Sequence, residues 1–291
     1  MDDGCYIYLQ KLALPNVVLL SQETFLGDDA PLQAAKLNRS KIEFYFTCSP
    51  SMPLYVLNHF PEVSQITYLD ADLFFFSDVT PIFEEIGTKS VAIIPHRFAW
   101  HGKYFEKYGK YNVGWVTFRR DEQGLECLTT WRNECLDWCF DHFEDGKFAD
   151  QKYLDTWPDN YSNLHIIQNL GANVASWNVG RFRVREKNEQ VLINGTPLIF
   201  YHFTHLKEIK PWLYKTELSK YFTWSTATIR RKIYGVYIDH LNKFAVVDKK
   251  PKRGRKEFRF RNLGYWIQRF THLARLLVFP DYLILINKKV V

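Results

Sequence analysis

Residues 65–78 read QITYLDADLFFFSD, an apolar run that stops at two aspartates and resumes with aromatic residues. The first half has the composition of a buried strand. Ligands of α/β proteins gather where strands end, and side chains two positions apart on an extended segment point the same way. Asp70 and Asp72 can therefore face one ion, and carboxylate oxygens suit a hard divalent cation. The stretch predicts a metal site; the competing interpretation is a solvated turn after the strand.

Short apolar segments and helical segments alternate on both sides of this stretch. Residues 90–95, 111–118, 164–167 and 197–203 have the pattern of short strands, and 121–143 carries apolar residues at helical spacing. Such alternation predicts an α/β fold, with a mixed, mostly parallel sheet flanked by helices. The remaining expected elements are a strand over 15–20 and helices over 3–14, 30–48, 50–60 and 81–86.

Composition and cysteine use describe a folded intracellular chain. Of its 291 residues 46% are hydrophobic and 24% charged, which excludes disorder over most of the length. The five cysteines form no Cys-x-x-Cys pair, so we expect buried free thiols and a reducing compartment; a metal pair of Cys135 and Cys139 is the alternative. Without a signal peptide pattern or an apolar run of transmembrane length, a cytoplasmic, soluble or peripheral protein is expected.

The charge is distributed unevenly along the chain. Residues 225–291 hold 16 Lys or Arg and 4 Asp or Glu, a net charge of +12, whereas residues 1–224 hold 22 and 28, a net charge of −6. We therefore expect a catalytic domain over 1–224 and a basic, aromatic-rich helical extension over 225–291. Residues 249–279 fit an anionic membrane surface, or equally a helix packed on the domain with a solvated basic face. No nucleic-acid module accompanies the charge.

Three further constellations carry polar side chains near expected strands. His202 follows the strand-like LIFY and can complete an Asp/Asp metal site, with Lys207 and Lys210 beyond it, although a histidine beside Phe is often structural. Asn112 and Gly114 interrupt a strand, where they mark either a ligand contact or a bulge. Asp150 and Gln151 offer acceptors and a donor to sugar hydroxyls, but Asp150 can instead cap a helix.

The order LDADLFF, YNVGWVTF, DQKYLD and YHF…KPW resembles the glycosyltransferases with the GT-A fold. It is closest to their glycogenin-like and lipopolysaccharide-galactosyltransferase-like group, and the resemblance covers roughly residues 1–215. The sequence departs from the pattern at His205, where the family usually has glycine, and its KPW comes two residues late. It also begins at what looks like the segment after the family's second strand, so we expect the family's first strand–helix unit to be missing from this sequence.

The resemblance implies a site residue by residue. Asp70, Asp72 and His202 would bind Mn²⁺ or Mg²⁺, Asn112 and Gly114 would contact the donor sugar, and Asp150 and Gln151 would act at the reacting sugar. Lys207 or Lys210 would meet the diphosphate, with Lys36 and Arg39 near the nucleotide.

The function that this resemblance implies is that of a metal-dependent, retaining hexosyltransferase. It would move a sugar from a UDP-sugar to a glycan or lipid-linked acceptor, at the cytoplasmic face of a membrane. Two alternatives stay open: an inactive nucleotide-sugar-binding protein, and a metal-dependent phosphohydrolase with Asp70 as nucleophile.

Overall fold

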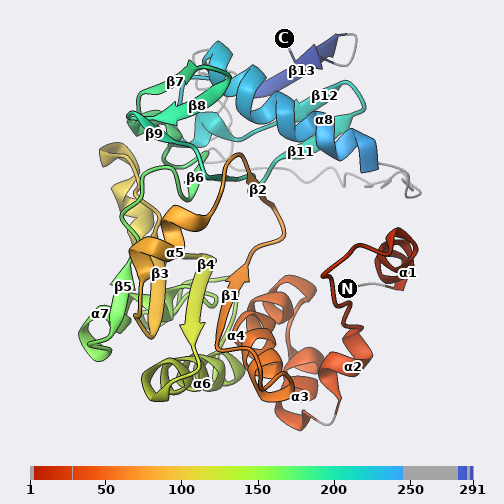
Figure 1. Cartoon of the computed structure of the whole chain (residues 1–291), viewed down its shortest axis with the longest axis vertical. Helices are drawn as coiled ribbons and strands as arrows, with labels where there is room; N and C mark the ends of the chain where they lie inside the picture. The colour runs from red at the N-terminus through yellow and green to blue at the C-terminus, as the bar shows by residue number, and fades with distance from the viewer. Residues whose placement is uncertain (1–2, 28, 245–280, 287–288, 291) are drawn as a thin grey trace, which may run out of the picture. The chain divides into compact units, whose positions relative to one another are not determined.

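The computed structural model describes residues 3–27, 29–244, 281–286 and 289–290 (Figure 1). They form two compact units, of which the first comprises Met1–Asp70, Ile86–Pro95 and Lys107–Ile167, and the second Ala71–Glu85, His96–Glu106 and Gln168–Val291. The chain first passes from one unit to the other between Asp70 and Ala71, within the LDADLFF motif. The basic segment 249–279 lies outside the described residues, so its membrane role and the boundary at 224/225 stay predictions.

The first unit is built on a four-stranded sheet with the order β1-β4-β3-β5. Its strands are β1 (Gln65–Leu69), β3 (Val91–Pro95), β4 (Tyr111–Arg119) and β5 (Leu164–Ile166). β4 pairs antiparallel with both β1 and β3, and β3 pairs parallel with β5. β4 lies between β1 and β3, and seven of its consecutive residues are therefore buried.

The helical segments of this unit are α1 (Asp3–Leu12), α2 (Gln22–Leu26), α3 (Ala30–Asn38), α4 (Lys41–His59), α6 (Glu122–Asp137), α7 (Trp157–Asn160) and the 3₁₀ turn η2 (Lys152–Thr156). Of these, α4, α6 and η2 pack on the sheet, and residues of α2 and α3 pack with α4 in a separate apolar cluster. α6 places Cys127, Leu128, Trp131 and Cys135 in one core cluster with β3 and β4, which confirms the helical spacing read from 121–143. All five cysteines are free thiols, and three of them are buried.

The second unit contains three smaller sheets. One has the order β2-β10-β6, with β2 (Leu73–Phe75), β6 (Val174–Ala175) and β10 (Phe200–His202). Another is formed by β7 (Val184–Lys187), β8 (Gln190–Ile193) and β9 (Thr196–Pro197), and the third by β11 (Lys207–Lys210), β12 (Leu213–Lys215), β13 (Tyr282–Ile286) and β14 (Lys289–Val290). The helical segments here are α5 (Thr80–Ile86), η3 (Val179–Arg181), η4 (Leu218–Tyr221), η5 (Ile229–Tyr234) and α8 (Gly235–Phe244), and η1 (Trp100–Tyr108) begins in this unit.

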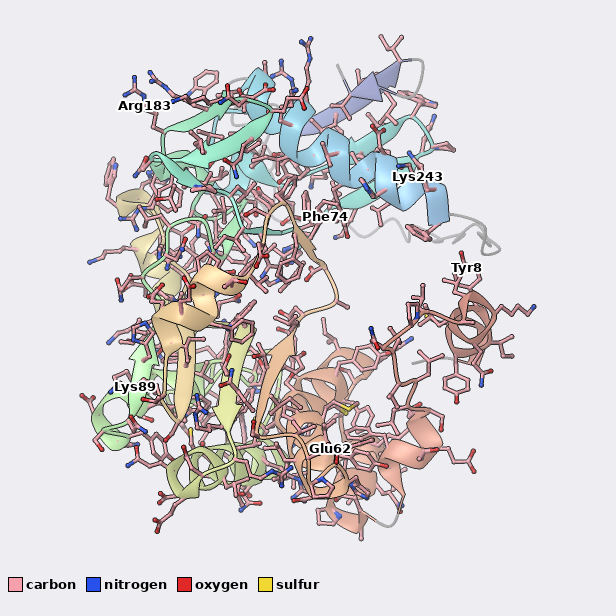
Figure 2. All side chains as sticks on the ribbon, in the orientation of Figure 1. Tyr8, Glu62, Phe74, Lys89, Arg183 and Lys243 are labelled. Atoms are coloured by element: carbon pink, nitrogen blue, oxygen red, sulfur yellow. The ribbon has the colours of Figure 1, made fainter. Side chains whose placement is uncertain are left out.

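Aromatic side chains join β2 and β10 to the helical segments of the second unit. The hydroxyls of Tyr201 and Tyr234 are hydrogen-bonded at 2.9 Å in a fully buried setting. Phe74, labelled in Figure 2, packs edge to face on Tyr237 with ring centroids 5.5 Å apart, and Phe203 stacks on the same tyrosine at 3.8 Å. This packing fixes β2 and β10 against η5 and α8, and so fixes the two strands that carry the candidate site.

A buried carboxylate holds residues 281–286 in the second unit. Asp281 is 1% exposed, and its two carboxylate oxygens accept hydrogen bonds of 2.6 Å from the backbone N–H and the hydroxyl of Ser219. Its carbonyl accepts from the N–H and hydroxyl of Thr216. β13 then pairs with β12, with Leu213 opposite Ile284. Residues 281–286 are therefore an integral part of this unit.

Three sequence-based expectations about the fold are wrong. Residues 15–20 form a loop rather than a strand, with Val18 78% exposed, so the apolar run finds no sheet partner. The helices expected over 30–48 and 50–60 are divided elsewhere: the break falls at Arg39, where Ser40 and Glu43 form a capping box, and α4 continues through Pro50 and Pro53 because packing on α6 and β1 supports it.

The sheets are mixed, as expected, but are not mostly parallel. Among the described strands only β3–β5 and β6–β10 pair parallel. β4 pairs antiparallel with both of its neighbours, and all pairs in the β7-β8-β9 and β11-β12-β13-β14 sheets are antiparallel. Antiparallel neighbours can be joined by a short turn and need no helical crossover. In the described residues no helix is both long and apolar enough to cross a membrane.

Gly124→Ala is predicted to destabilise the first unit. Alanine in a helix is ordinarily more favourable than glycine by about 1 kcal/mol. Here, however, an added Cβ would lie 2.1 Å from the Arg119 carbonyl oxygen and 3.0 Å from that of Ser90, both backbone atoms. Overpacking of this kind costs ~1–3 kcal/mol, so we expect a net loss of about 2 kcal/mol in urea unfolding. The exposed Thr129→Ala on the same helix is the control; equal stability of both variants would contradict the clash.

Candidate metal centre

The pairing of β2 with β10 brings Asp72 and His202 together. In this antiparallel pair His202 lies opposite Leu73, the residue after Asp72. The N–H of Phe203 donates to the Asp72 carbonyl at 2.9 Å, which extends the pairing by one residue. As a result His202 Nε2 lies 2.8 Å from Asp72 Oδ1. Two residues separated by 130 positions in the sequence are thus joined by strand register within the second unit.

The imidazole of His202 is buried and held by an aromatic neighbour. Its ring is 4% exposed and meets the ring of Trp177 edge to face, with centroids 5.1 Å apart. The indole N–H of Trp177 donates to the carbonyl of His96 at 2.9 Å, and the rings of Trp177 and His96 are also in edge-to-face contact. Trp177 is therefore fixed at both its nitrogen and its ring face, and it limits how His202 can turn.

Asn178 ties together the loop on which Trp177 stands. Its amide nitrogen donates to the carbonyls of His96 and Asn173, and its amide oxygen accepts from the N–H of Ala175. Ala175 lies opposite His202 in the parallel β6–β10 pair. Trp177 and Asn178 were not predicted from the sequence. The signal that could have indicated them is their position just after the short apolar segment that forms β6, because ligands of α/β proteins gather where strands end.

The carboxylate of Asp72 is tuned by its histidine partner. Burial by itself would raise the pKa of Asp72, but the hydrogen bond and charge of His202 outweigh it and leave that pKa below its ordinary value. Asp72 therefore stays ionised at neutral pH. An ionised, half-buried oxygen beside an imidazole is a suitable ligand pair for a divalent transition metal.

Asp70 ends β1 and is held by groups of the first unit. Its N–H donates to the carbonyl of Gly114 at 3.4 Å, and its Oδ1 accepts from the Tyr68 hydroxyl at 3.0 Å. The Ser49 hydroxyl is 3.2 Å from that of Tyr68. Burial, followed by the charge of Asp70, raises the pKa of Tyr68 well above its ordinary value, so the phenol remains a donor. The orientation of Asp70 is thereby set by a phenol and a serine from α4.

Asp70, Asp72 and His202 each offer one ligand atom, and these atoms lie within 4.8 Å of one another. Asp70 and Asp72 are close because one residue separates them in the chain, and Asp72 and His202 because of strand register. Carboxylate oxygens and an imidazole nitrogen are a ligand set for Mn²⁺ or Mg²⁺. This group could therefore hold a metal ion, as the sequence predicted; the identity of the ion stays a prediction.

Asp150 is a buried carboxylate of the first unit whose pKa is affected by the charge of Asp70. It is 4% exposed and follows Ala149, whose φ of 47° is unusual for a residue other than glycine. Burial raises the pKa of Asp150 to about 7; the Ser49 hydroxyl lowers it and the charge of Asp70 raises it. Asp150 thus shares its serine with the network that holds Asp70.

Gln151, Asn112 and Gly114 are used by the fold itself. The amide of Gln151 donates to the carbonyl of Tyr108 at 3.0 Å. Asn112 lies at a bulge between β3 and β4, and its side-chain oxygen accepts from the N–H of Gly114 at 3.1 Å. The bulge interpretation of Asn112 is therefore correct as structure. Gly114 in turn supports Asp70, and contacts of these residues with a sugar stay predictions.

The four basic candidates lie in different surroundings. Lys36 is exposed in the last turn of α3, whereas the guanidinium of Arg39 lies 3.9 Å over the Phe140 ring and donates to the carbonyls of Leu136 and Asp137. Lys207 and Lys210 are exposed on β11, and the ammonium of Lys210 lies 5.4 Å over the ring of Trp212. Arg39 thus caps the end of α6, while Lys207 is the lysine nearer in sequence to His202.

His205 occupies a backbone conformation that glycine prefers. Its φ is 62°, in the left-handed region, at the position where the GT-A pattern usually has glycine. Histidine tolerates this region better than most residues. Its Nδ1 lies 3.9 Å from a carboxylate oxygen of Glu217, and burial lowers the pKa of the imidazole. The departure from the family pattern therefore concerns the side chain and leaves the turn intact.

Fold and site together define a mixed α/β protein with an Asp-Asp-His group suited to a metal ion. The chain is 30% identical over 253 residues to the uncharacterized protein YfnD of Bacillus subtilis, covering 84% of this chain and 78% of YfnD. It is 34% identical over 220 residues to YfnF of the same organism, covering 70% and 69%. The chain belongs to the family of these two proteins.

Comparison with family models and solved structures adds two findings. No family model matches the sequence. The structure resembles a crystal structure of a glycosyltransferase involved in the glycosylation of the major capsid of PBCV-1, with a TM-score of 0.40 and 12% identity over 58% of this chain and 73% of that one.

Asp150→Asn is predicted to make stability less dependent on pH. Because the pKa of Asp150 is raised from 3.8 to about 7 in the folded chain, folding keeps a proton that the unfolded chain releases. Stability from this group is present below pH ~4 and is lost as pH rises to ~7. In urea unfolding with a chelator, the variant should gain about 2 kcal/mol on the wild type between pH 5 and pH 8. The exposed Asp159→Asn is the control, and parallel curves for Asp150→Asn and the wild type would contradict the raised pKa.

Proposed function

We propose that this protein is a metal-dependent glycosyltransferase that takes its sugar from a nucleotide-sugar donor. The observation that carries the proposal is the Asp70–Asp72–His202 group, formed where β1 ends and where β2 pairs with β10. The resemblance of LDADLFF, YNVGWVTF, DQKYLD and YHF…KPW to the GT-A pattern supports it, because the order of these motifs predicted His202 as the third member of the group.

The proposed donor is a UDP-sugar, and the proposed ion is Mn²⁺ or Mg²⁺. When bound, the ion would offset the negative charge of the departing diphosphate. Asp72 supplies an ionised oxygen, and His202 supplies a nitrogen whose ring is held by Trp177. Lys207 or Lys210 would add positive charge at the diphosphate, because an ammonium group stabilises a developing phosphate anion.

The residues proposed at the reacting sugar are Asp150 and Gln151. With its pKa raised to about 7, Asp150 can hold or release a proton near neutral pH, which suits a group that hydrogen-bonds a sugar hydroxyl. Asn112 and Gly114 would contact the donor sugar, with Lys36 and Arg39 toward the nucleotide. We propose a glycan or lipid-linked acceptor and retention of configuration, at the cytoplasmic face of a membrane.

The first test is a thermal-shift titration with UDP, with and without Mn²⁺. UDP at about 100 times its dissociation constant should add ~2.7 kcal/mol of apparent stability, which is a rise of roughly 4–5 °C in Tm for a chain of this length. The rise should require Mn²⁺ and should be lost in Asp72→Asn, because the variant removes an anionic ligand. Asp159→Asn, an exposed residue of the first unit, should behave as the wild type.

Turnover separates the proposal from its rivals. Transfer of sugar from a UDP-sugar to an oligosaccharide, with a loss of at least tenfold in Asp150→Asn, supports the transferase. A Mn²⁺-dependent shift with neither transfer nor donor hydrolysis for any UDP-sugar tried identifies an inactive binding protein. Release of phosphate through a trapped phosphoenzyme on Asp70 identifies a phosphohydrolase. A wild type whose Tm changes with neither Mn²⁺ nor UDP refutes the donor site.

A further inference from the structure

The hairpin of β7 and β8 carries cations at alternate positions from the residue before β7 to the last residue of that strand. Arg183, Arg185 and Lys187 are exposed, and we call these three residues the basic row. The side chain between the first two, Val184, packs on the core of the second unit. The one between the last two, Glu186, has its carboxylate 2.7 Å from the ammonium of Lys232. The carboxylate of Glu186 is therefore already paired with an ammonium group, and the three positions that alternate with Val184 and Glu186 are basic.

Strand geometry sets the spacing within the basic row. β7 pairs antiparallel with β8 in regular register, with Arg185 opposite Leu192 and Lys187 opposite Gln190. Alternate residues of an extended strand are about 7 Å apart, so the row spans about 13 Å. At its beginning the N–H of Arg183 donates to the side-chain oxygen of Asn194 at 2.8 Å, which fixes the backbone there.

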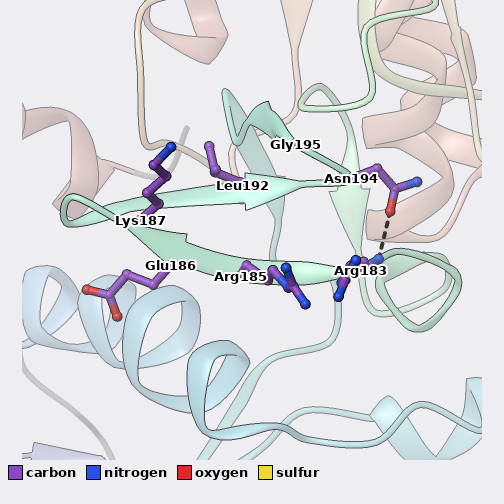
Figure 3. A pocket seen from close by; sticks show the side chains of 7 residues that line it. All are labelled: Arg183, Arg185, Glu186, Lys187, Leu192, Asn194 and Gly195. Atoms are coloured by element: carbon purple, nitrogen blue, oxygen red, sulfur yellow. Dashed lines mark hydrogen bonds between the residues drawn. The ribbon is translucent and has the colours of Figure 1, made fainter.

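The basic row borders a shallow pocket on the hairpin (Figure 3). The pocket has a volume of about 510 Å³, and its lining residues are Arg183, Arg185, Glu186, Lys187, Leu192, Asn194 and Gly195. Figure 3 shows the basic side chains spread along the hairpin, with Leu192 on the neighbouring strand and Asn194 just beyond it, joined to Arg183 by a hydrogen bond. A Cβ at Gly195 would meet no atom within 4 Å, so that edge of the pocket is open.

The charges of the basic row are not balanced within the described part of the chain. Among the residues that the structure describes, none of the three cations has a carboxylate oxygen within 4.0 Å. Like charges at this spacing repel one another, weakly in water but additively. An anion placed between them would remove this repulsion, and guanidinium groups bind phosphate oxygens in a planar, two-point geometry.

A simpler explanation is that the charges protect an edge strand. β7 is an edge of the sheet β7-β8-β9, and charged side chains on edge strands prevent association with other chains. Protection, however, works with charges of either sign, and mixed signs would avoid the repulsion. The acidic residue of the strand, Glu186, also lines the pocket, but its carboxylate is paired with Lys232, so the cations of the basic row are the charges left without an ion-pair partner along β7 in the described residues. This selection of sign favours a ligand.

We propose that the basic row binds a linear phosphodiester polymer other than a nucleic acid, and that this polymer lies along β7. The polymer carries one negative charge per repeat, and a repeat of about 7 Å places successive phosphates opposite Arg183, Arg185 and Lys187. Leu192 and Asn194 border the same space and would contact the neutral part of a repeat that lies there. The inference is independent of the metal centre and of the proposed transferase activity.

The test uses the full chain and a fluorescein-labelled dodecamer of abasic deoxyribose phosphates, which has the phosphodiester spacing without bases. Binding is followed by fluorescence anisotropy over a range of salt concentrations. Arg183→Glu/Arg185→Glu should raise Kd at least tenfold and lower the slope of log K against log salt by about 1.4, which is two phosphate contacts at ~0.7 each. Lys11→Glu/Lys41→Glu, two exposed residues of α1 and α4, makes the same change in net charge and should alter Kd less than twofold.

Each other outcome overturns the proposal. Equal weakening by both double variants, with unchanged circular dichroism, means that the row serves only to protect the edge strand. A tenfold preference for the same dodecamer with bases identifies a nucleic acid as the ligand. Capture by phosphatidylglycerol vesicles through the row, without binding of the free dodecamer, identifies a membrane surface.

Discussion

The hydrogen bond between His202 and Asp72 is the interaction on which the candidate site depends. It exists because β2 and β10 pair in a register that puts His202 opposite Leu73. The same register brings the Phe203 N–H to the Asp72 carbonyl, and the aromatic packing of Phe74 and Phe203 on Tyr237 fixes the two strands against α8. A shift of one residue would turn the imidazole to the other side of the sheet. The metal group is therefore a consequence of strand pairing, and its buried neighbours stabilise that pairing.

The carboxylates around the site differ in protonation because their surroundings differ. Asp72 has an imidazole partner and a lowered pKa, whereas Asp150 is buried near the charge of Asp70 and has a raised one. Within the first unit, Ser49 takes part in the networks of both Asp70 and Asp150 through Tyr68 and its own hydroxyl. Two carboxylates with opposite pKa shifts can serve as a permanent anion and as a proton carrier, which is a division of labour common in enzymes.

Much of this could be predicted from local sequence, and the rest could not for identifiable reasons. The strand ending at Asp70, the helix with Trp131 and the strand over 111–118 follow from apolar spacing, which local structure obeys. His202 was predicted from the order of motifs rather than from spacing. Trp177 and Ser49 escaped because their roles depend on partners that are not their neighbours in the sequence. Tyr68 escaped because the apolar pattern places it in a strand and says nothing of the hydroxyl that it donates to Asp70, two residues on. The loop over 15–20 and the helix through Pro50 were mispredicted because tertiary packing overrides propensity.

The anchoring of Asp281 on Ser219 couples the end of the chain to the second unit. β13 pairs with β12, but residues 245–280 separate it from α8, so the ribosome makes this strand long after its partner. Until β13 has been made, one edge of β12 is unpaired, and Ser219 and Thr216 lack the acceptors that Asp281 provides. The sheet that contains β12 can therefore be completed only after residue 286 has been made. A nascent chain stopped between residues 215 and 281 would expose an unpaired edge of β12, and unpaired strand edges favour association between incompletely folded chains.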